Sequence, residues 1–353
     1  MNKKNINRVI WLDYARTFAI ICVIITHVTE RVYTMSADWM LQASLFTRIY
    51  SYFLFTLGRL GVPIFLFLTG YLLLDKEYTS AMIRRLYKKN LFNLLVTTWI
   101  WIIVYSVFNA LLFKTPISIF TIIKNMLFLQ QTNMSHMWYM PVIIGMYLFI
   151  PLIANGLKHI ETSSLYLPLG IAFVYICVIP TVNVILRLFN VSTVLYPLLD
   201  CSFSGGVYGL CLLLGYLVKK GSFDKWKLSS ILIIGCVSFI LAVLLQVISI
   251  SFTFTNNVWY DSFLLLIASL SVFLSISRMN LQYAKLIQNL SIDSFGIYLI
   301  HNPIILILLR YLHIQSRFLS VAIILVLTVL ISFSIAEICK KNKHIGQILL
   351  YIK

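Results

Sequence analysis

Long apolar runs separated by short polar segments are the dominant pattern of this chain. In a helix that rises about 1.5 Å per residue, runs of this length reach across most or all of the roughly 30 Å hydrocarbon core of a bilayer. The runs cover approximately residues 9–28, 49–74, 91–113, 138–157, 165–181, 201–218, 229–249, 259–277, 295–312 and 318–338. The pattern predicts an all-α fold, a membrane helix bundle with about ten transmembrane helices. We expect one domain over residues 1–353, with its core at about 9–338.

Composition supports a polytopic membrane protein. Hydrophobic residues make up 60% of the 353 residues and charged residues 11%, and the mean hydropathy is +0.92. A soluble domain could not bury this much apolar surface, so the lipid bilayer is the expected surroundings. The six cysteines have no Cys-x-x-Cys spacing, and neither a disulfide framework nor a metal site is predicted.

The net charge of +17 raises the possibility of nucleic-acid binding. The Lys and Arg residues lie in short segments between apolar runs, however, where they are typical of topology determinants, so no nucleic-acid partner is expected. If the N-terminus is cytoplasmic, 19 of them fall on the inner side and 7 on the outer side. This bias predicts that both termini are cytoplasmic.

The first run contains the most informative polar residues. Arg16 and His27 are eleven positions apart, so in a helix they share a face to within roughly 20° and lie about 16 Å apart along the axis. Ionisable side chains in a membrane need a partner or a wet cavity. Arg16 could form a structural ion pair with Asp13, one turn earlier, or bind a ligand. His27 could be an interfacial histidine satisfied by water, or a general base with Glu30 one turn further on.

The second run carries another cation, Arg59, in a segment with three glycines, Pro63 and Thr69. These residues should loosen the helix. Two interpretations are open: freed backbone groups face a cavity with Arg59 near His27, or the glycines form a helix-packing surface with Arg59 at the interface.

Two further motifs open the fourth and ninth runs. His-Met-Trp-Tyr, with Trp138, fits an interfacial aromatic belt or a stacking surface for a sugar ring or an acyl donor. In the ninth run, Asp293 and Ser294 are predicted to cap the helix N-terminus, and Asn302-Pro303 to kink the helix. His301 between them is expected to have a structural or a catalytic role. The sequence holds no Gly-x-Ser-x-Gly, Walker, His-Glu-x-x-His or Gly-x-Gly-x-x-Gly motif, so the corresponding hydrolase, ATPase, metalloprotease and nucleotide-dependent redox classes are unsupported.

Taken in order, these motifs resemble the integral membrane acyltransferase 3 family. The motifs are Leu-Asp-x-x-Arg with Arg-x10-His, Gly-Val-Pro-Ile-Phe-x-Phe-Leu-Thr-Gly-Tyr, His-Met-Trp-Tyr and Ser-Phe-Gly-Ile-Tyr-Leu-Ile-His, and they extend over about residues 9–338. The chain is similar to the short, single-domain members that act on surface polysaccharides. One departure is Thr69, where the family commonly has Ser.

The resemblance implies a membrane-bound O-acyltransferase of the bacterial cytoplasmic membrane. It would move an acetyl group from cytoplasmic acetyl-CoA to a hydroxyl of a surface glycan or its lipid-linked precursor, with no permanently bound cofactor. It leaves the oligomeric state, the acyl group and the acceptor glycan open. An exporter or flippase of a polysaccharide or lipid-linked glycan is the alternative from another class, because polar residues in a bundle also line transport paths.

The resemblance also implies roles for particular residues. Arg16 and His27 match the essential pair of the family, and Arg59 and Trp138 match more loosely. We expect three catalytic residues: His27 as the base or a transient acyl carrier, Arg16 at the anionic donor, and Arg59 at the developing oxyanion. The expected substrate-binding residues are Asp13, Trp138, Thr69 and His301.

Overall fold

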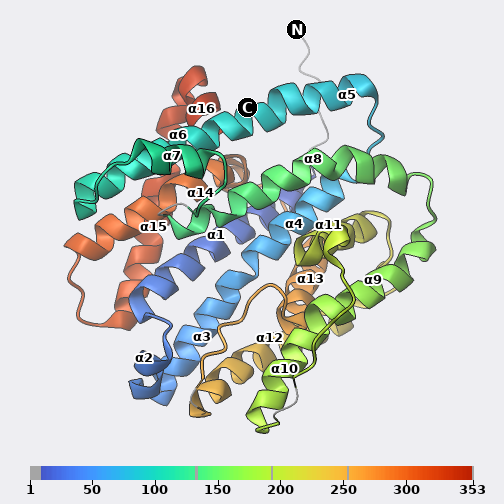
Figure 1. Cartoon of the computed structure of the whole chain (residues 1–353), viewed down its shortest axis with the longest axis horizontal. Coiled ribbons are helices and arrows are strands. Elements are labelled where there is room, and N and C mark those ends of the chain that lie inside the picture. The colour runs from blue at the N-terminus through green and yellow to red at the C-terminus, as the bar shows by residue number, and fades with distance from the viewer. Residues whose placement is uncertain (1–8, 132–133, 192–193, 253, 352–353) are drawn as a thin grey trace. The chain divides into compact units, whose positions relative to one another are not determined.

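The computed structural model describes residues 9–131, 134–191, 194–252 and 254–351, and within these residues every regular element is a helix. The predicted all-α fold is therefore confirmed. Lys3, Lys4, Arg8 and Lys353, which enter the charge count, lie outside the described residues. The α-helices in chain order are α1 Ile10–Tyr33, α2 Ala37–Gln42, α3 Leu45–Arg59, α4 Gly61–Leu73, α5 Ser80–Arg85, α6 Phe92–Phe113, α7 Ile119–Met126, α8 Tyr139–Leu157, α9 Tyr166–Phe173, α10 Ile179–Leu188, α11 Gly206–Lys219, α12 Leu228–Ser251, α13 Phe263–Arg278, α14 Lys285–Tyr311, α15 Arg317–Lys341 and α16 Lys343–Leu350 (Figure 1).

The predicted membrane spans correspond to helices of the structure. Eight helical stretches in the described chain are long and apolar enough to cross a membrane: Ile10–Tyr33, Leu45–Leu73, Ser80–Phe113, Ser135–Leu157, Thr162–Leu188, Leu228–Ser251, Lys285–Tyr311 and Arg317–Lys341. Two shorter apolar helices, α11 and α13, occupy the sixth and eighth predicted runs. The chain is thus a multi-pass membrane protein. The inside location of the termini stays a prediction.

One predicted helix boundary is wrong. α14 begins at Lys285 rather than near 295, so Asp293 and Ser294 lie within the helix and do not cap it. Both side chains are buried, which is why polar residues that are typical of a cap occur here inside a helix. Pro303 also lies within α14, and the helix continues past it to Tyr311.

The chain divides into two compact units. Unit 1 consists of Met1–Thr26, Met35–Tyr71 and Leu169–Ser294, and unit 2 of His27–Thr34, Leu72–Pro168 and Phe295–Lys353. Both α1 and α14 start in unit 1 and end in unit 2. Each of these helices therefore supplies polar residues to both units. The single domain over residues 1–353 stays a prediction.

In unit 1, small residues allow α3 and α4 to pack directly on α1. A Cβ atom at Gly58 would lie 2.5 Å from the backbone nitrogen of Thr26, and one at Gly61 would lie 2.5 Å from the carbonyl oxygen of Ala19. Pro63 falls in the first turn of α4, where its missing N–H leaves no helical hydrogen bond unmade. These contacts support the interpretation of the second run as a helix-packing surface.

In unit 2, the segment between the third and fourth predicted runs contains a further helix, α7, which returns alongside α6 (Figure 1). The indole of Trp99 on α6 donates a hydrogen bond to the carbonyl of Met126 at 3.0 Å. On α6, Thr97 and Trp101 donate to the carbonyls of Ile348 and Leu349 in α16. α6 is thereby fixed on two sides, one turn before Tyr105.

Candidate active site

Three histidine rings meet in unit 2. His27 comes from α1, His136 from the 3₁₀ helix Ser135–Trp138 that leads into α8, and His301 from α14. The distances between ring centroids are 5.3 Å for His27 and His301, 5.1 Å for His136 and His301, and 6.0 Å for His27 and His136. His136 and His301 are buried, whereas 13% of the His27 side chain is exposed. The site is therefore nearly dry, with His27 as its most accessible ring.

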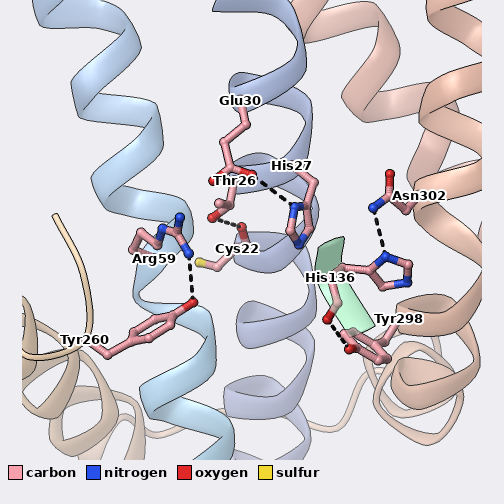
Figure 2. Close-up of polar contacts among 9 residues, drawn as sticks. All are labelled: Cys22, Thr26, His27, Glu30, Arg59, His136, Tyr260, Tyr298 and Asn302. Atoms are coloured by element: carbon pink, nitrogen blue, oxygen red, sulfur yellow. Dashed lines mark hydrogen bonds and ion pairs between the residues drawn. The ribbon is translucent and has the colours of Figure 1, made fainter. Parts of the chain in front are cut away.

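His27 is oriented by a carboxylate on its own helix. Its Nδ1 lies 3.2 Å from Oε2 of Glu30, one turn further along α1 (Figure 2). A carboxylate only accepts hydrogen bonds, so Nδ1 carries the hydrogen and the neutral ring has its lone pair on Nε2. Among the described residues, no hydrogen bond engages that Nε2. This is the arrangement of a general base with an orienting acid.

His136 is held at both ring nitrogens. The hydroxyl of Tyr105 donates its one hydrogen to the carbonyl of Leu299 at 2.5 Å, so it accepts from Nε2–H of His136 at 3.1 Å. Nδ1 of His136 then has the lone pair and accepts from Nδ2 of Asn302 at 2.8 Å. The hydroxyl of Tyr298 donates to the His136 carbonyl at 2.6 Å (Figure 2). Both ring nitrogens of His136 are therefore engaged, and the ring acts as a positioning residue between Tyr105 and Asn302.

Pro303 explains why the Leu299 carbonyl is available to Tyr105. A proline has no N–H, so Pro303 cannot give the helical hydrogen bond to the carbonyl four residues earlier, which is that of Leu299. Tyr105 supplies the missing donor from α6. Neighbouring helices commonly compensate for proline inside a membrane in this way.

His301 has one engaged nitrogen and one unengaged nitrogen. Nδ1 donates to the carbonyl of Tyr298 at 2.6 Å and lies 3.3 Å from that of Ile297. Nε2 is buried and has no hydrogen-bond partner in the described part of the chain. The neutral ring therefore carries an unpaired lone pair in the same cluster as His27.

In unit 1, Asp13 and Arg16 come together through a serine of α14. Ser291 donates from Oγ to Oδ1 of Asp13 at 2.7 Å and accepts from Nη1 of Arg16 at 3.0 Å. The direct separation of the two charged groups is 3.9 Å, and the Arg16 side chain is 29% exposed. Arg16 is thus positioned by α14, while part of its side chain remains exposed.

Arg59, also in unit 1, is enclosed by aromatic rings. Its Nη1 donates to the hydroxyl of Tyr260 at 3.2 Å (Figure 2). The guanidinium carbon lies 4.3 Å from the ring centroid of Trp259 and 4.7 Å from that of Phe55, both within the range of cation–π attraction. Only 6% of the residue is exposed, so the charge is held by these rings rather than by water.

Thr69 and Trp138 differ in what their side chains can offer. The Thr69 hydroxyl donates to the Phe65 carbonyl of its own helix at 2.8 Å, which commits its hydrogen. Trp138 is half-buried and lines a pocket of about 370 Å³ in unit 2 with side chains that include Thr98, Gln130 and Gln131. The residues that line this pocket carry aromatic, aliphatic, thioether, hydroxyl and amide groups. This uncharged lining favours a neutral ligand and supports the stacking interpretation over a simple belt.

The comparisons with known proteins agree with the motifs and the fold. A family model described as an acyltransferase domain, acyltransferase 3, matches residues 9–337. The chain belongs to the acyltransferase 3 family. No curated protein and no solved structure matches it. The protein is therefore a membrane acyltransferase.

Within this acyltransferase, the structure groups the predicted site residues by unit. His27, His301 and Trp138 belong to unit 2, and Asp13, Arg16, Arg59 and Thr69 to unit 1. The structure brings His27 and His301 together, and it brings Asp13 and Arg16 together. The catalytic and binding roles of all seven stay predictions.

Sequence reasoning missed four members of the acyltransferase's histidine cluster: Tyr105, His136, Tyr298 and Asn302. His136 and Tyr298 lie within the motifs His-Met-Trp-Tyr and Ser-Phe-Gly-Ile-Tyr-Leu-Ile-His, and Asn302 directly follows the second of them. A histidine and an amide in two apolar runs were a usable signal. The pairing itself spans 166 positions, which no local pattern reveals.

Among the described residues, no three His, Cys, Asp or Glu side chains are arranged to hold a metal ion. The histidine cluster illustrates why: both nitrogens of His136 are engaged by Tyr105 and Asn302, so it has no lone pair for a metal.

Proposed function

We propose that this membrane acyltransferase is an O-acetyltransferase of the cell membrane. It takes an acetyl group from cytoplasmic acetyl-CoA and transfers it to a hydroxyl of a surface polysaccharide or its lipid-linked precursor. The observation that carries the proposal is the His27–Glu30 pair, because it presents an imidazole lone pair in a nearly water-free site. A hydroxyl is a weak nucleophile, and such a base is what it needs.

In this proposal, Nε2 of His27 removes the proton of the acceptor hydroxyl while the hydroxyl oxygen attacks the thioester carbonyl. The tetrahedral intermediate then breaks its carbon–sulfur bond. The coenzyme A thiolate leaves and takes the proton from the imidazolium, so the base is regenerated. Glu30 stabilises the imidazolium while it exists, as the carboxylate does in a Ser-His-Asp triad. If His27 instead carries the acetyl group transiently, its Nε2 bonds to the carbonyl carbon as the carbon–sulfur bond breaks. The acceptor hydroxyl then displaces the imidazole from that carbon, and the proton of the hydroxyl passes by way of Nε2 to the coenzyme A thiolate.

Arg16 and Arg59 have different roles in the proposal. Arg16 lies about 16 Å from His27 along α1, so no single atom contacts both side chains. Arg16 binds the anionic part of the donor. Arg59 stabilises the oxyanion, a task for which a guanidinium outside water is effective. Asp13 and Thr69 support donor binding, and Trp138 stacks on a ring of the acceptor.

The test is the acetyl content of surface glycans, measured by mass spectrometry in a deletion strain complemented with variants. We expect wild type to restore acetylation and His27→Ala to abolish it at a normal protein level. His159→Ala, a substitution of an exposed histidine, is the matched control and should restore acetylation fully.

His27→Ala with unchanged acetylation would refute the proposal. Loss of polymer export with acetylation intact would favour the exporter or flippase instead.

A further inference from the structure

The histidine cluster presents hydrogen-bond acceptors without donors to match them. Nε2 of His301 and Oδ1 of Asn302 are both buried, and neither has a hydrogen-bond partner among the residues that the structure describes. Nε2 of neutral His27 is a third lone pair, on a ring whose centroid is 5.3 Å from that of His301. Leaving buried polar groups of this kind unpaired is unfavourable.

The orientations of the His301 ring and the Asn302 amide are fixed by hydrogen bonds, so neither group can turn a donor toward the unpaired acceptors. Nδ1 of His301 donates to the Tyr298 carbonyl, and rotating the ring would break that bond. Nδ2 of Asn302 donates to His136, and flipping the amide would place its oxygen against another lone pair. A ligand that satisfies this part of the site must therefore bring hydrogen-bond donors.

This requirement distinguishes the reacting groups of the two substrates, the thioester of the donor and the hydroxyl of the acceptor. The thioester carbonyl of an acyl donor only accepts hydrogen bonds, so it gains nothing from these atoms. A sugar hydroxyl donates one. With His27 engaged by the hydroxyl that reacts, His301 is left for a second hydroxyl of the same molecule.

We propose that His301 is the binding residue for the acceptor substrate: its Nε2 accepts a hydrogen bond from the hydroxyl next to the one that His27 deprotonates. The site would thus select acceptors with two neighbouring hydroxyls. This inference rests on the proposed function of His27 and extends it to the arrangement of the acceptor. His136 is a positioning residue, because its Nδ1 accepts the hydrogen bond that fixes the Asn302 amide.

Two substitutions of His301 separate its two nitrogens. In His301→Asn, the side-chain amide lies near the position of Nδ1 and can keep donating to Tyr298, but no atom replaces Nε2. In His301→Gln, the longer side chain can place its amide oxygen near the position of Nε2. If the role of His301 in α14 is purely structural, His301→Asn should preserve the affinity for the acceptor better than His301→Gln. If His301 binds the acceptor, His301→Gln should preserve it better.

The experiment measures binding of small glycosides to the purified full chain without an acyl donor, by isothermal titration calorimetry in detergent. The probes are the methyl glycosides of glucose, galactose, mannose and N-acetylglucosamine, and the monodeoxy derivatives of the tightest binder. We expect His301→Asn to weaken the tightest binder roughly fivefold to tenfold, which corresponds to one lost hydrogen bond, and His301→Gln to retain most of the affinity.

One monodeoxy derivative should bind wild type as weakly as the parent glycoside binds His301→Asn. The same derivative should bind wild type and His301→Asn with equal affinity. That derivative identifies the second hydroxyl. The monodeoxy derivatives also test the hydrogen bond with the wild-type protein alone, so the test does not depend on whether a His301 variant folds.

The inference is overturned if no glycoside binds, if His301→Asn binds like wild type because water satisfies Nε2, or if every monodeoxy derivative binds wild type like its parent. Acetyl transfer from acetyl-CoA to the same glycosides, measured in parallel, tests the proposed function separately. If one monodeoxy derivative binds more weakly than its parent but no acetyl group is transferred, the proposed function is contradicted and the proposed hydroxyl-binding role of His301 is still supported.

Discussion

At the scale of single residues, the position of one hydrogen on each imidazole determines what the ring can do. Glu30 places the His27 hydrogen on Nδ1. In Glu30→Gln the amide oxygen can still accept that hydrogen bond, but the negative charge that stabilises the imidazolium is lost. We expect the rate of acetyl transfer to fall roughly tenfold to a hundredfold, less than on loss of the base itself. Initial rates with purified protein, at saturating acetyl-CoA, measure the change, and the KM for acetyl-CoA should stay the same.

A matched control is Glu337→Gln, which removes the charge of another i,i+3 pair, with Lys340 on α15. It should leave the rate unchanged. A full rate in Glu30→Gln would show that His27 needs no charged partner.

The sequence alone could suggest the His27–Glu30 pair, because i,i+3 spacing is local. It could not reveal that Tyr105 and Asn302 fix His136, because these contacts join residues 31 and 166 positions apart.

At the scale of elements, α6 and α14 are connected through the carbonyl that Pro303 leaves without its helical donor. Tyr105→Phe removes the substitute donor, and we expect the free energy of unfolding to fall by about 1–3 kcal/mol. In a Pro303→Ala background, the new backbone N–H can bond to Leu299, so the same substitution should be less destabilising. Denaturant unfolding of the four proteins in detergent gives the coupling as a double-mutant cycle. Equal losses in the two backgrounds would contradict this account.

Apolar runs predicted where the long helices occur, but not where each one starts. The wrong start of the ninth helix has a physical cause: Asp293 and Ser294 are polar residues inside a bundle, where other helices surround them, rather than a cap. α7 was missed because its eight residues are too few to stand out as an apolar run. Its place beside α6 depends on the long-range bond between Trp99 and Met126. Packing contacts of this kind have no local sequence signal.

At the scale of the whole molecule, composition alone identified a multi-pass membrane protein, and the order of four motifs identified its family. The orientation in the membrane is a separate property, set by loop charges rather than by packing. The proposed function depends on it, because the proposed donor, acetyl-CoA, is cytoplasmic. With both termini inside, α1 runs outward, so Arg16 faces the donor side and His27 the acceptor side. The opposite orientation would exchange the two roles.

Site-directed labelling of single cysteines tests the orientation. In a background without the six native cysteines, we expect Lys114→Cys, after α6, to react with a membrane-impermeant maleimide in intact cells. Lys225→Cys, between α11 and α12, should react only after permeabilisation. Both lysines are exposed, so access to the reagent and not burial should decide the outcome. The reverse pattern would place Arg16 on the outer side, and a cytoplasmic acetyl-CoA could then not be its ligand.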